Sequence, residues 1–514
     1  MSNQRGTIIT LVLVFGAIFL ILLSGLLSFI LFQHRQSLQK AAWNDALHIA
    51  EAGVNYYRWH LNHTPEDQQP DIQDGNSWCC KVGGVEYTQD SPQCQKDGFT
   101  VCGVCDGEPC YEHDYYDPEG KLAGKFILEI KAKKVCDQIL GVYVSSCGIS
   151  QKFPKLKRTV RAKYASTSIG EYAYILNSNV WAGEDREIYG KYHSNGGIKM
   201  DGTHNSLVSS ATNKWECGLS FDCDQGDCPS GCVPNGAVCE CDGVCGAGGP
   251  TDLWKFPVPP FDFEGITADL DKIKNLSQTK GKYYPPSTDI DDEGKGYHVI
   301  FNSDGTFDIK IITELEEVDC YSAENGWNEV CKEKIIAEKY LPSPYETDDV
   351  SLPEGCGLIF VEDNLWVEGT VKGRKTIASA DLIGSDDTTT ILNWNLDYTT
   401  LDGSDSLAVI TEKNILIPLN SPNEMILRGV FVAQKGLFGR RHYQTGTYKR
   451  DLLTIYGTIV SNGRVGTKWT YYHGGWASGY NERENYFDEK LARDPPPLLP
   501  YVSKELELIS WEEI

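Results

Sequence analysis

The stretch TIITLVLVFGAIFLILLSGLLSFILF, residues 7–32, decides how the rest of the chain is organised. It is uncharged throughout and longer than the ~20 residues that a helix needs to cross the hydrocarbon core of a bilayer. A cleaved secretory signal has a shorter apolar core of about 7–15 residues, followed by small residues. This run instead ends in Phe32-Gln33-His34-Arg35, so we expect a membrane-spanning helix.

The helical pattern continues beyond the apolar run. Apolar residues recur at helical spacing with Gln, Lys, Asp and Glu between them, which indicates an amphipathic stem. They are Leu38, Ala41, Ala42, Ala46, Leu47, Ile49, Ala50, Gly53, Val54, Tyr57 and Leu61. A helix over 7–62 would be on the order of 80 Å long at ~1.5 Å per residue. We expect it to end before Pro65, because the residue preceding a proline is pushed out of the helical region.

All eighteen cysteines lie between Cys79 and Cys356, outside the apolar segment. Cysteine-dense, loop-rich sequence beside a membrane segment is typical of disulfide-bonded structure on the oxidising side. The flanking charges determine orientation only weakly. From the cysteines we predict a single-pass membrane protein with its C-terminal region extracellular, at the cell surface or in a pilus. The disulfide candidates are Cys79, Cys80, Cys94, Cys102, Cys105, Cys110, Cys136, Cys147, Cys217, Cys223, Cys228, Cys232, Cys239, Cys241, Cys245, Cys320, Cys331 and Cys356.

The length of the chain indicates how many folded units to expect, and its net charge excludes some classes of partner. A chain of 514 residues is expected to fold as roughly two to four units. With 72 acidic and 47 basic residues, the formal charge is -25. A surface of that sign is not built to neutralise phosphate, so we expect no nucleic-acid partner.

The N-terminal residues resemble a known family. A short polar leader ending in Arg5-Gly6, the apolar helix directly after it, and the stem AEAGVNYYRW at 50–59 resemble type IV prepilins. The likeness is strongest to PilX-type pilus assembly proteins and to the large minor pseudopilins of type II secretion. It implies cleavage by a prepilin peptidase between Gly6 and Thr7, methylation of the new amine, and packing of the helix against other pilins or pseudopilins.

One departure from the family pattern concerns the fifth mature position. Major pilins carry a glutamate there, which pairs with the amine of a neighbouring subunit, whereas this chain has Leu11. The same absence is a feature of the PilX-type and large pseudopilin branches, which are thought to act at the tip or as initiators. The resemblance therefore implies a minor, tip-proximal subunit. An uncleaved membrane anchor is the alternative.

The remaining sequence predicts a mainly-β region and hence an α+β fold class. Residues 63–167 read as a cysteine-rich, pilin-like β domain, with strands at 125–131, 138–144 and 157–164. It resembles the sheet that pilins fold over the stem. A glycine-centred apolar rhythm recurs at 365–371, 426–432 and 453–460 and in part at 188–198. Short strands with recurring glycines are typical of stacked turns of a parallel β-solenoid, with a β-sandwich as the alternative.

The predicted boundaries follow from these patterns. We assign 1–6 to the leader, 7–62 to the helix, 168–475 to the solenoid-like domain, and 476–514 to a closing segment. Two insertions interrupt the solenoid: the cysteine-rich stretch 217–245, and 251–353, which opens with a proline-rich linker and holds Cys320 and Cys331, expected to pair. Cys356 is a candidate partner for the odd cysteine of 217–245. The wider likeness of 171–514 to bacterial surface proteins that join a pilin-type helix to a β region implies no activity.

Two kinds of group in the sequence could bind a metal. Cys239, Cys241 and Cys245 have a spacing that could bind zinc as thiolates, but disulfides are favoured in an oxidising compartment. Two acidic groups offer the oxygen ligands of calcium: Asp222, Asp224 and Asp227, and Asp289, Asp291, Asp292 and Glu293. Neither matches the twelve-residue calcium loop, so solvated loops are favoured, and we predict no metal and no other cofactor.

We predict no enzyme. The chain lacks the HExxH, GxSxG and GxxxxGK[ST] patterns. Asp386 and Asp387 could suggest an acid–base pair of a polysaccharide-active solenoid, but neighbours on a strand point to opposite faces. Cys102 and Cys105 could form a redox pair but lack the βαβ context of one.

Aromatic residues supply the remaining functional hint. They crowd a glycine-rich stretch at Trp469, Tyr471, Tyr472, His473 and Trp476. Such side chains stack on sugars and are favoured in contact surfaces, although packing in a core is the more common use. We therefore expect a structural and assembly role through the helix, with the bilayer and other pilins as partners and adhesion to a surface glycan or protein as a further candidate. A membrane-anchored adhesin outside any filament is the alternative.

Overall fold

The computed structural model describes residues 4–63, 78–82, 85–88, 111–136, 138–224, 227–264, 269–322, 326–353, 355–382, 384, 387–444, 448–471 and 475–514. The chain divides into two compact units. Unit 1 comprises Met1–Lys134, Gly141–Ala165 and Leu506–Ile514, and unit 2 comprises Val135–Leu140 and Ser166–Glu505. The predicted fold class, a long N-terminal helix followed by a mainly-β region, is confirmed.

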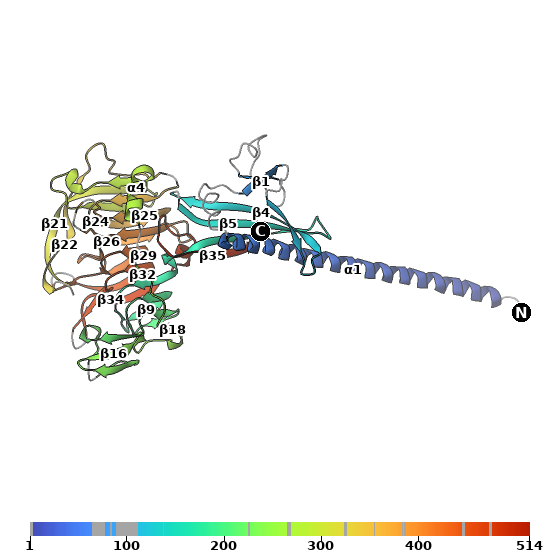
Figure 1. The fold of residues 1–514 in the computed structure, drawn as a ribbon, viewed down its shortest axis with the longest axis horizontal. Helices are drawn as coiled ribbons and strands as arrows, with labels where there is room; N and C mark the ends of the chain where they lie inside the picture. Colours follow the sequence, from blue (N-terminus) through green and yellow to red (C-terminus); the bar gives the residue numbers. More distant parts are fainter. Residues whose placement is uncertain are drawn as a thin grey trace. The chain divides into compact units, whose positions relative to one another are not determined.

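The described part of unit 1 consists of a long helix, a five-stranded sheet and a separate pair of strands (Figure 1). Helix α1 (Gln4–His63) runs for 60 residues without a break. The sheet has the order β3-β4-β5-β6-β35. Its strands are β3 (Tyr111–Tyr116), β4 (Leu122–Val135), β5 (Gln138–Ser150), β6 (Lys157–Ser168) and β35 (Tyr501–Glu513), and β1 (Trp78–Val82) and β2 (Val85–Thr88) form a separate antiparallel pair. The three segments predicted as strands fall within β4, β5 and β6.

The C-terminal half of α1 packs on this sheet because both surfaces carry small residues. Ala42, Ala46 and Ala50 are fully buried. A Cβ added to Gly148 of β5 would lie 2.0 Å from the carbonyl oxygen of Ala46, so helix and strand touch backbone to backbone. The hydroxyl of Tyr164 in β6 donates to the Val54 carbonyl at 3.4 Å. Glycine and alanine thus set the close approach of the helix to the sheet.

Unit 2 is a stack of short strands joined in parallel ladders. One ladder runs in the order β19 (Lys282–Tyr284), β23 (Leu358–Val361), β25 (Arg374–Ser379), β27 (Ser406–Thr411), β29 (Glu424–Ala433), β32 (Lys449–Ser461), β7 (Tyr172–Leu176), β10 (Lys191–Ser194), β13 (Val208–Ser210) and β18 (Trp254–Lys255).

A second ladder runs in the order β20 (Tyr297–Phe301), β24 (Leu365–Val371), β26 (Thr389–Tyr398), β29, β32, β34 (Trp476–Tyr486), β9 (Arg186–Tyr189) and β12 (Thr203–His204). Shorter ladders join β26 to β28 (Asn414–Leu416) and β30 (Phe438–Gly439), and β8 (Val180–Ala182) to β11 (Ile198–Met200) and β17 (Val244–Cys245). These pairings are parallel, as stacked turns require and as a sandwich of antiparallel strands does not.

The glycine rhythm marks the corners of the stack. Gly190, Gly369, Gly429 and Gly457 all have positive φ, the region that favours glycine. Strands β29 and β32 bend at Gly429 and Gly457, which face each other in the ladder, so each strand contributes to two ladders. The recurring glycines therefore lie where the strands change direction.

The order of the strands in the stack differs from their order in the chain. Strand β32 pairs with β29 on one side and with β7 on the other, and β34 pairs with β9. Residues 172–255 therefore continue a stack whose neighbouring turn comes from 449–486. We call this seam the junction. Side chains reinforce it: Asn177 donates to Asn462 at 2.8 Å, and the ring of Tyr486 stacks on Tyr189 at 5.0 Å and on Tyr456 at 4.9 Å.

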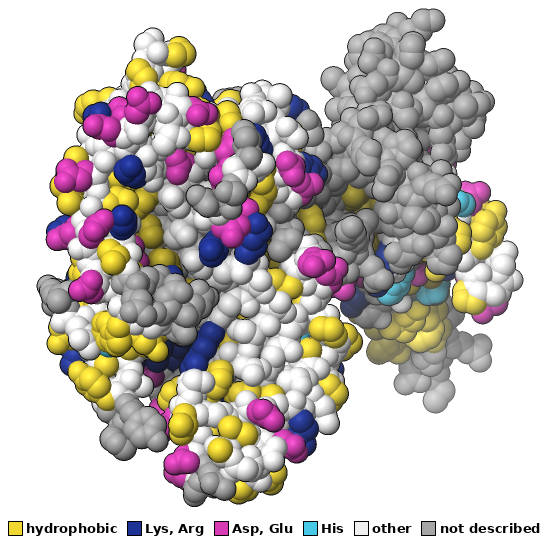
Figure 2. Space-filling model, turned by 60° about the vertical axis from the view of Figure 1, so that its left-hand side comes forward, with side chains coloured by type: hydrophobic (Ala, Val, Ile, Leu, Met, Phe, Trp, Pro, Cys, Tyr) yellow, Lys and Arg dark blue, Asp and Glu magenta, His cyan; other side chains and the backbone are white. Residues whose placement is uncertain are grey.

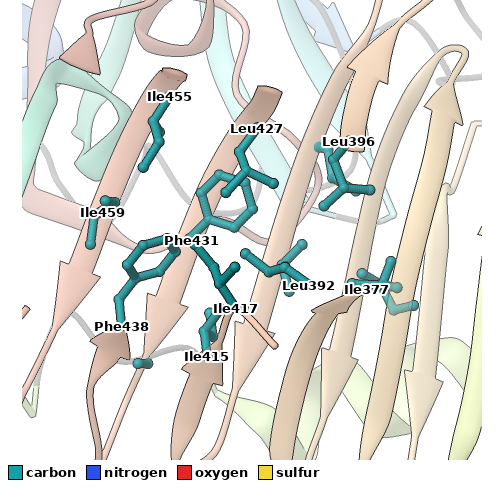
Figure 3. Packing of buried hydrophobic residues seen from close by; sticks show 14 of the residues in the cluster. Ile377, Leu392, Leu396, Ile415, Ile417, Leu427, Phe431, Phe438, Ile455 and Ile459 are labelled. Carbon is teal, nitrogen blue, oxygen red and sulfur yellow. The ribbon is translucent and has the colours of Figure 1, made fainter. Parts of the chain in front are cut away.

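The core of unit 2 is a column of aliphatic and aromatic side chains that point inward from successive strands. Figure 3 shows Leu396, Leu427 and Ile455 in one row, and Phe431 beside Phe438. Leu396 pairs with Leu427, and Leu427 with Ile455, so like residues stack from turn to turn. Burial of these rows is the main force that holds the turns together.

A small antiparallel sheet, a long hairpin and several short elements lie outside the two long ladders. β14 (Lys214–Cys217), β15 (Cys232–Asn235) and β16 (Val238–Asp242) form a small antiparallel sheet, and β21 (Phe307–Ser322) and β22 (Gly326–Tyr340) form a long hairpin. The remaining elements are α4 (Leu270–Lys280), α5 (Glu489–Arg493), η1 (Ile169–Glu171), η2 (Leu219–Phe221), η3 (Thr251–Leu253), η4 (Ser287–Asp289), β31 (His442–Tyr443) and β33 (Lys468–Thr470).

Two predicted boundaries differ from the structure. The stretch 251–353, predicted as one insertion, contributes β18, β19 and β20 to the stack, and only the β21–β22 hairpin projects from it. Of the predicted closing segment 476–514, β34 belongs to the stack and β35 to the sheet of unit 1. Both differences arise because ladder partners lie far apart in the chain, where local composition carries no signal.

Candidate functional site

The N-terminal half of α1 is the first candidate site. Every described residue from 11 to 41 is exposed, and the large apolar side chains of residues 11–32 have exposed fractions between 48% (Ile18) and 69% (Ile21). The helix is long and apolar enough to cross a membrane, with a mean hydropathy of 2.7 in its most apolar window. A continuous apolar surface of this kind needs lipid or other helices to cover it.

The predicted processing site lies at the start of this helix. The backbone of Gly6 and Thr7 is helical and belongs to α1. The side chain of Leu11 is exposed. Cleavage between Gly6 and Thr7 stays a prediction.

The cysteines of the small antiparallel sheet are joined to one another. The bonds are Cys217–Cys223, Cys228–Cys239 and Cys232–Cys241, so Cys239 and Cys241 are not available as thiolates. Among the cysteines whose side chains the structure describes, Cys245 alone is free. Burial raises the pKa of its thiol to about 12, with Asp201 adding to the rise and Lys199 opposing it. At neutral pH the thiol is therefore protonated and unreactive.

Two further pairs lie outside that sheet. Cys320 is bonded to Cys331 across the β21–β22 hairpin. Cys356 is bonded to Cys136, 220 residues away, so our expectation that it completes the 217–245 cluster was wrong. Cys147 is also disulfide-bonded. The predictions on Cys79, Cys80, Cys94, Cys102, Cys105 and Cys110 fall outside the side chains that the structure describes.

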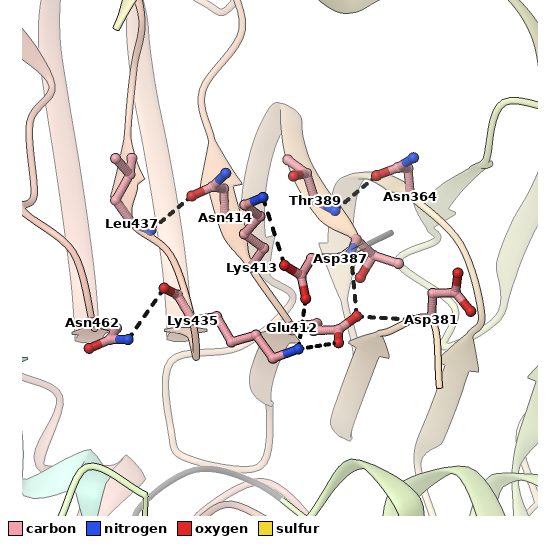
Figure 4. A network of polar contacts seen from close by, with 11 residues as sticks. Asn364, Asp381, Asp387, Thr389, Glu412, Lys413, Asn414, Lys435, Leu437 and Asn462 are labelled. Atoms are coloured by element: carbon pink, nitrogen blue, oxygen red, sulfur yellow. Dashed lines mark hydrogen bonds and ion pairs between the residues drawn. The ribbon is translucent and has the colours of Figure 1, made fainter. Parts of the chain in front are cut away.

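The acidic candidates take part in ion pairs at the edge of the stack (Figure 4). Lys435 donates to Asp387 and to Glu412, each at 2.7 Å, and Lys413 lies 3.7 Å from Asp387. The hydrogen bond from Lys435 lowers the pKa of Asp387, which keeps it ionised and paired. Asp386, its proposed partner in acid–base chemistry, lies outside the described residues. The arrangement around Asp387 fixes a corner of the stack.

Two of the calcium candidates are also held in ion pairs with a lysine. Asp291 and Glu293 both accept from Lys339, at 3.1 Å and 2.7 Å. An ammonium group thus occupies the place that a cation ligated by these two carboxylates would need. The backbone N–H of Asp227 donates to the carbonyl oxygen of Asp224 at 2.9 Å.

The aromatic hint at Trp469 leads to a cluster that sequence alone did not reveal. Trp469 of β33 stacks on His442 of β31 at 5.6 Å and meets the edge of Tyr321 in β21 at 5.4 Å. Trp327 of β22 lies 5.5 Å from Tyr321 and 5.1 Å from His442. We call Tyr321, Trp327, His442 and Trp469 the four-ring cluster. Tyr472 and His473 lie outside the described residues, and Trp476 packs under Lys449 instead.

Two charged residues near the four-ring cluster, Arg440 and Glu333, are buried. The guanidinium of Arg440 is 2% exposed and lies over the rings of Tyr443 and Tyr480, at 5.3 Å and 5.7 Å. Glu333 is buried and accepts a hydrogen bond from the hydroxyl of Tyr443. On the face that Figure 2 shows, acidic and basic side chains lie scattered among one another, without the broad basic area that a phosphate backbone requires.

Comparison with known proteins adds little. A search of protein-family models finds no match to this sequence, and a search of curated proteins finds none. Among solved structures, the chain is similar to the competence-associated pilin ComZ from Thermus thermophilus, with 12% sequence identity over 92% of this chain and 98% of that one. The TM-score of 0.29 is below the level at which two chains share a fold.

Proposed function

We propose that this chain is a pilin-like surface protein whose N-terminal helix inserts into a membrane or packs among the helices of a filament, with the β region on the outer side. The observation that carries the proposal is the division of α1. Its first half is apolar and exposed, and one face of its second half is buried against the sheet of unit 1.

The continuity of α1 supports assembly beyond simple anchoring. A membrane anchor needs only ~20 residues, whereas this helix runs on for 60 and offers the pilin arrangement of an apolar rod joined rigidly to a sheet. We propose a minor, tip-proximal position, because Leu11 removes the carboxylate through which major pilins pair. We propose no catalysis and no cofactor, since Asp387 is held by two lysines. A membrane-anchored adhesin outside any filament is the second candidate.

N-terminal sequencing of the protein from its native membrane tests the proposal. We expect a mature chain that begins at Thr7. Gly6→Val should leave Met1 in place and remove the protein from sheared filaments. Gly466→Ala serves as the control, because Gly466 lies outside α1 and a Cβ there meets nothing within 4 Å. A wild-type chain that keeps Met1 and never enters the filament fraction would refute assembly and leave the anchored adhesin.

A further inference from the structure

The four-ring cluster is held in place from several sides. Tyr321 and His442 face each other across the β21–β31 pairing, and the Cys320–Cys331 bond fixes the hairpin that carries Tyr321 and Trp327. The indole nitrogen of Trp469 donates to the Arg440 carbonyl at 2.9 Å. Since the rings are fixed before any ligand arrives, a ligand loses little affinity to ordering them.

Three polar atoms on these rings make no hydrogen bond to any described residue. The hydroxyl of Tyr321 and the indole nitrogen of Trp327 hydrogen-bond no described residue. His442 contacts Ser478 through Nδ1 at 2.5 Å, and its Nε2 has no such contact among the described residues. Trp327 is 46% exposed. One largely exposed ring, that of Trp327, thus lies beside uncharged donors and acceptors that bond no described residue.

This combination matches one class of ligand. A pyranose presents apolar C–H faces that stack on aromatic rings, with hydroxyl groups around its rim that hydrogen-bond to neutral donors and acceptors. We propose that the four-ring cluster is a binding site for a neutral saccharide, with Trp327 as the stacking residue. The proposal goes beyond the assembly role of α1 and does not depend on it.

Size and charge favour a saccharide over other partners. A protein interface needs about 800 Å² from each side, whereas one aromatic ring supplies ~150–250 Å² and only Trp327 of the four is largely exposed. Arg440 and Glu333 are buried, so an anionic ligand would meet no exposed counter-charge from these two groups. The formal charge of -25 further opposes nucleic acid.

Titration of the full-length protein in detergent tests the proposal, with tryptophan fluorescence as the readout. The neutral probes are cellotetraose and chitotetraose, and tetragalacturonate and a single-stranded oligothymidylate are the anionic arms. We expect at least one neutral probe to bind with a dissociation constant below about 1 mM. Trp327→Ala should weaken binding at least ~10-fold, whereas Trp394→Ala, which removes an equally exposed (47%) tryptophan on β26, should not.

Tyr321→Phe distinguishes a loss of binding from a loss of folding. It keeps the ring and removes only the free hydroxyl, so thermal unfolding should be unchanged while affinity falls by a few-fold. The proposal is overturned if neither neutral probe binds, if only an anionic arm binds, or if Trp327→Ala and Trp394→Ala have the same effect.

Discussion

Substitution of Gly457 by alanine tests the idea that paired corner glycines permit the strands to stack. Gly457 has φ +133°, and a Cβ there would lie 2.0 Å from the carbonyl oxygen of Gly429, its ladder partner. Real Cβ atoms keep more than 3 Å from such an oxygen, so the backbone must shift by about 1 Å in a strand paired on both sides. Strain at positive φ costs ~1–3 kcal/mol, and overpacking costs another ~1–3 kcal/mol. We therefore expect a loss of about 2–6 kcal/mol.

Gly373→Ala is the matched control. Gly373 also has positive φ, +78°, but a Cβ there meets nothing within 4 Å. It should lose only the left-handed penalty, about 1–2 kcal/mol. Urea unfolding gives both values, and hydrogen exchange at the amides of β29 and β32 localises the effect. The reasoning is refuted if Gly457→Ala destabilises no more than Gly373→Ala.

Three further predictions concern the junction, a buried histidine and the free thiol. Tyr486→Ala removes two ring stacks and should lower the free energy of unfolding by about 1–3 kcal/mol in urea. Burial opposes protonation of His298, but hydrogen bonds to Glu338 and Glu368 outweigh it and raise its pKa. Its contribution to stability is therefore complete below the unfolded pKa near 6.5 and is lost as pH rises through the higher folded pKa, measured as unfolding free energy between pH 6 and 9. Native Cys245 should resist iodoacetamide at pH 8 and react only in denaturant, as mass spectrometry of the alkylated peptide will report.

Each of these three predictions can be contradicted by a specific result. Tyr340→Ala removes a tyrosine that is 63% exposed, and an equal effect from it would argue against the ring stacks. His298→Gln should abolish the loss of stability above pH 6.5, and an unchanged slope would mean that another group causes it. Rapid alkylation of Cys245 in the folded protein would show that the thiol is not enclosed.

The candidate sites were accessible to sequence reasoning in unequal degree. The apolar half of α1 was evident from an uncharged run of residues 7–32, which is longer than the ~20 residues that a membrane-spanning helix needs. Trp469 was singled out by its crowded neighbourhood, but Tyr321, Trp327 and His442 carried no signal. They reach Trp469 only because a hairpin lies against a strand more than one hundred residues later in the chain.

The sequence by itself determined the local features: a long helix, its apolar half, and the glycines at which strands turn. Each depends on residues a few positions apart, through helical periodicity or the φ range of a single glycine. Only the tertiary structure decided that residues 172–255 stack on 449–486, that Cys136 pairs with Cys356, and that four rings meet. Those outcomes depend on which strands pair and so bury each other's apolar side chains. Several parallel strands have similar composition, so the local sequence does not determine which of them become neighbours in the stack.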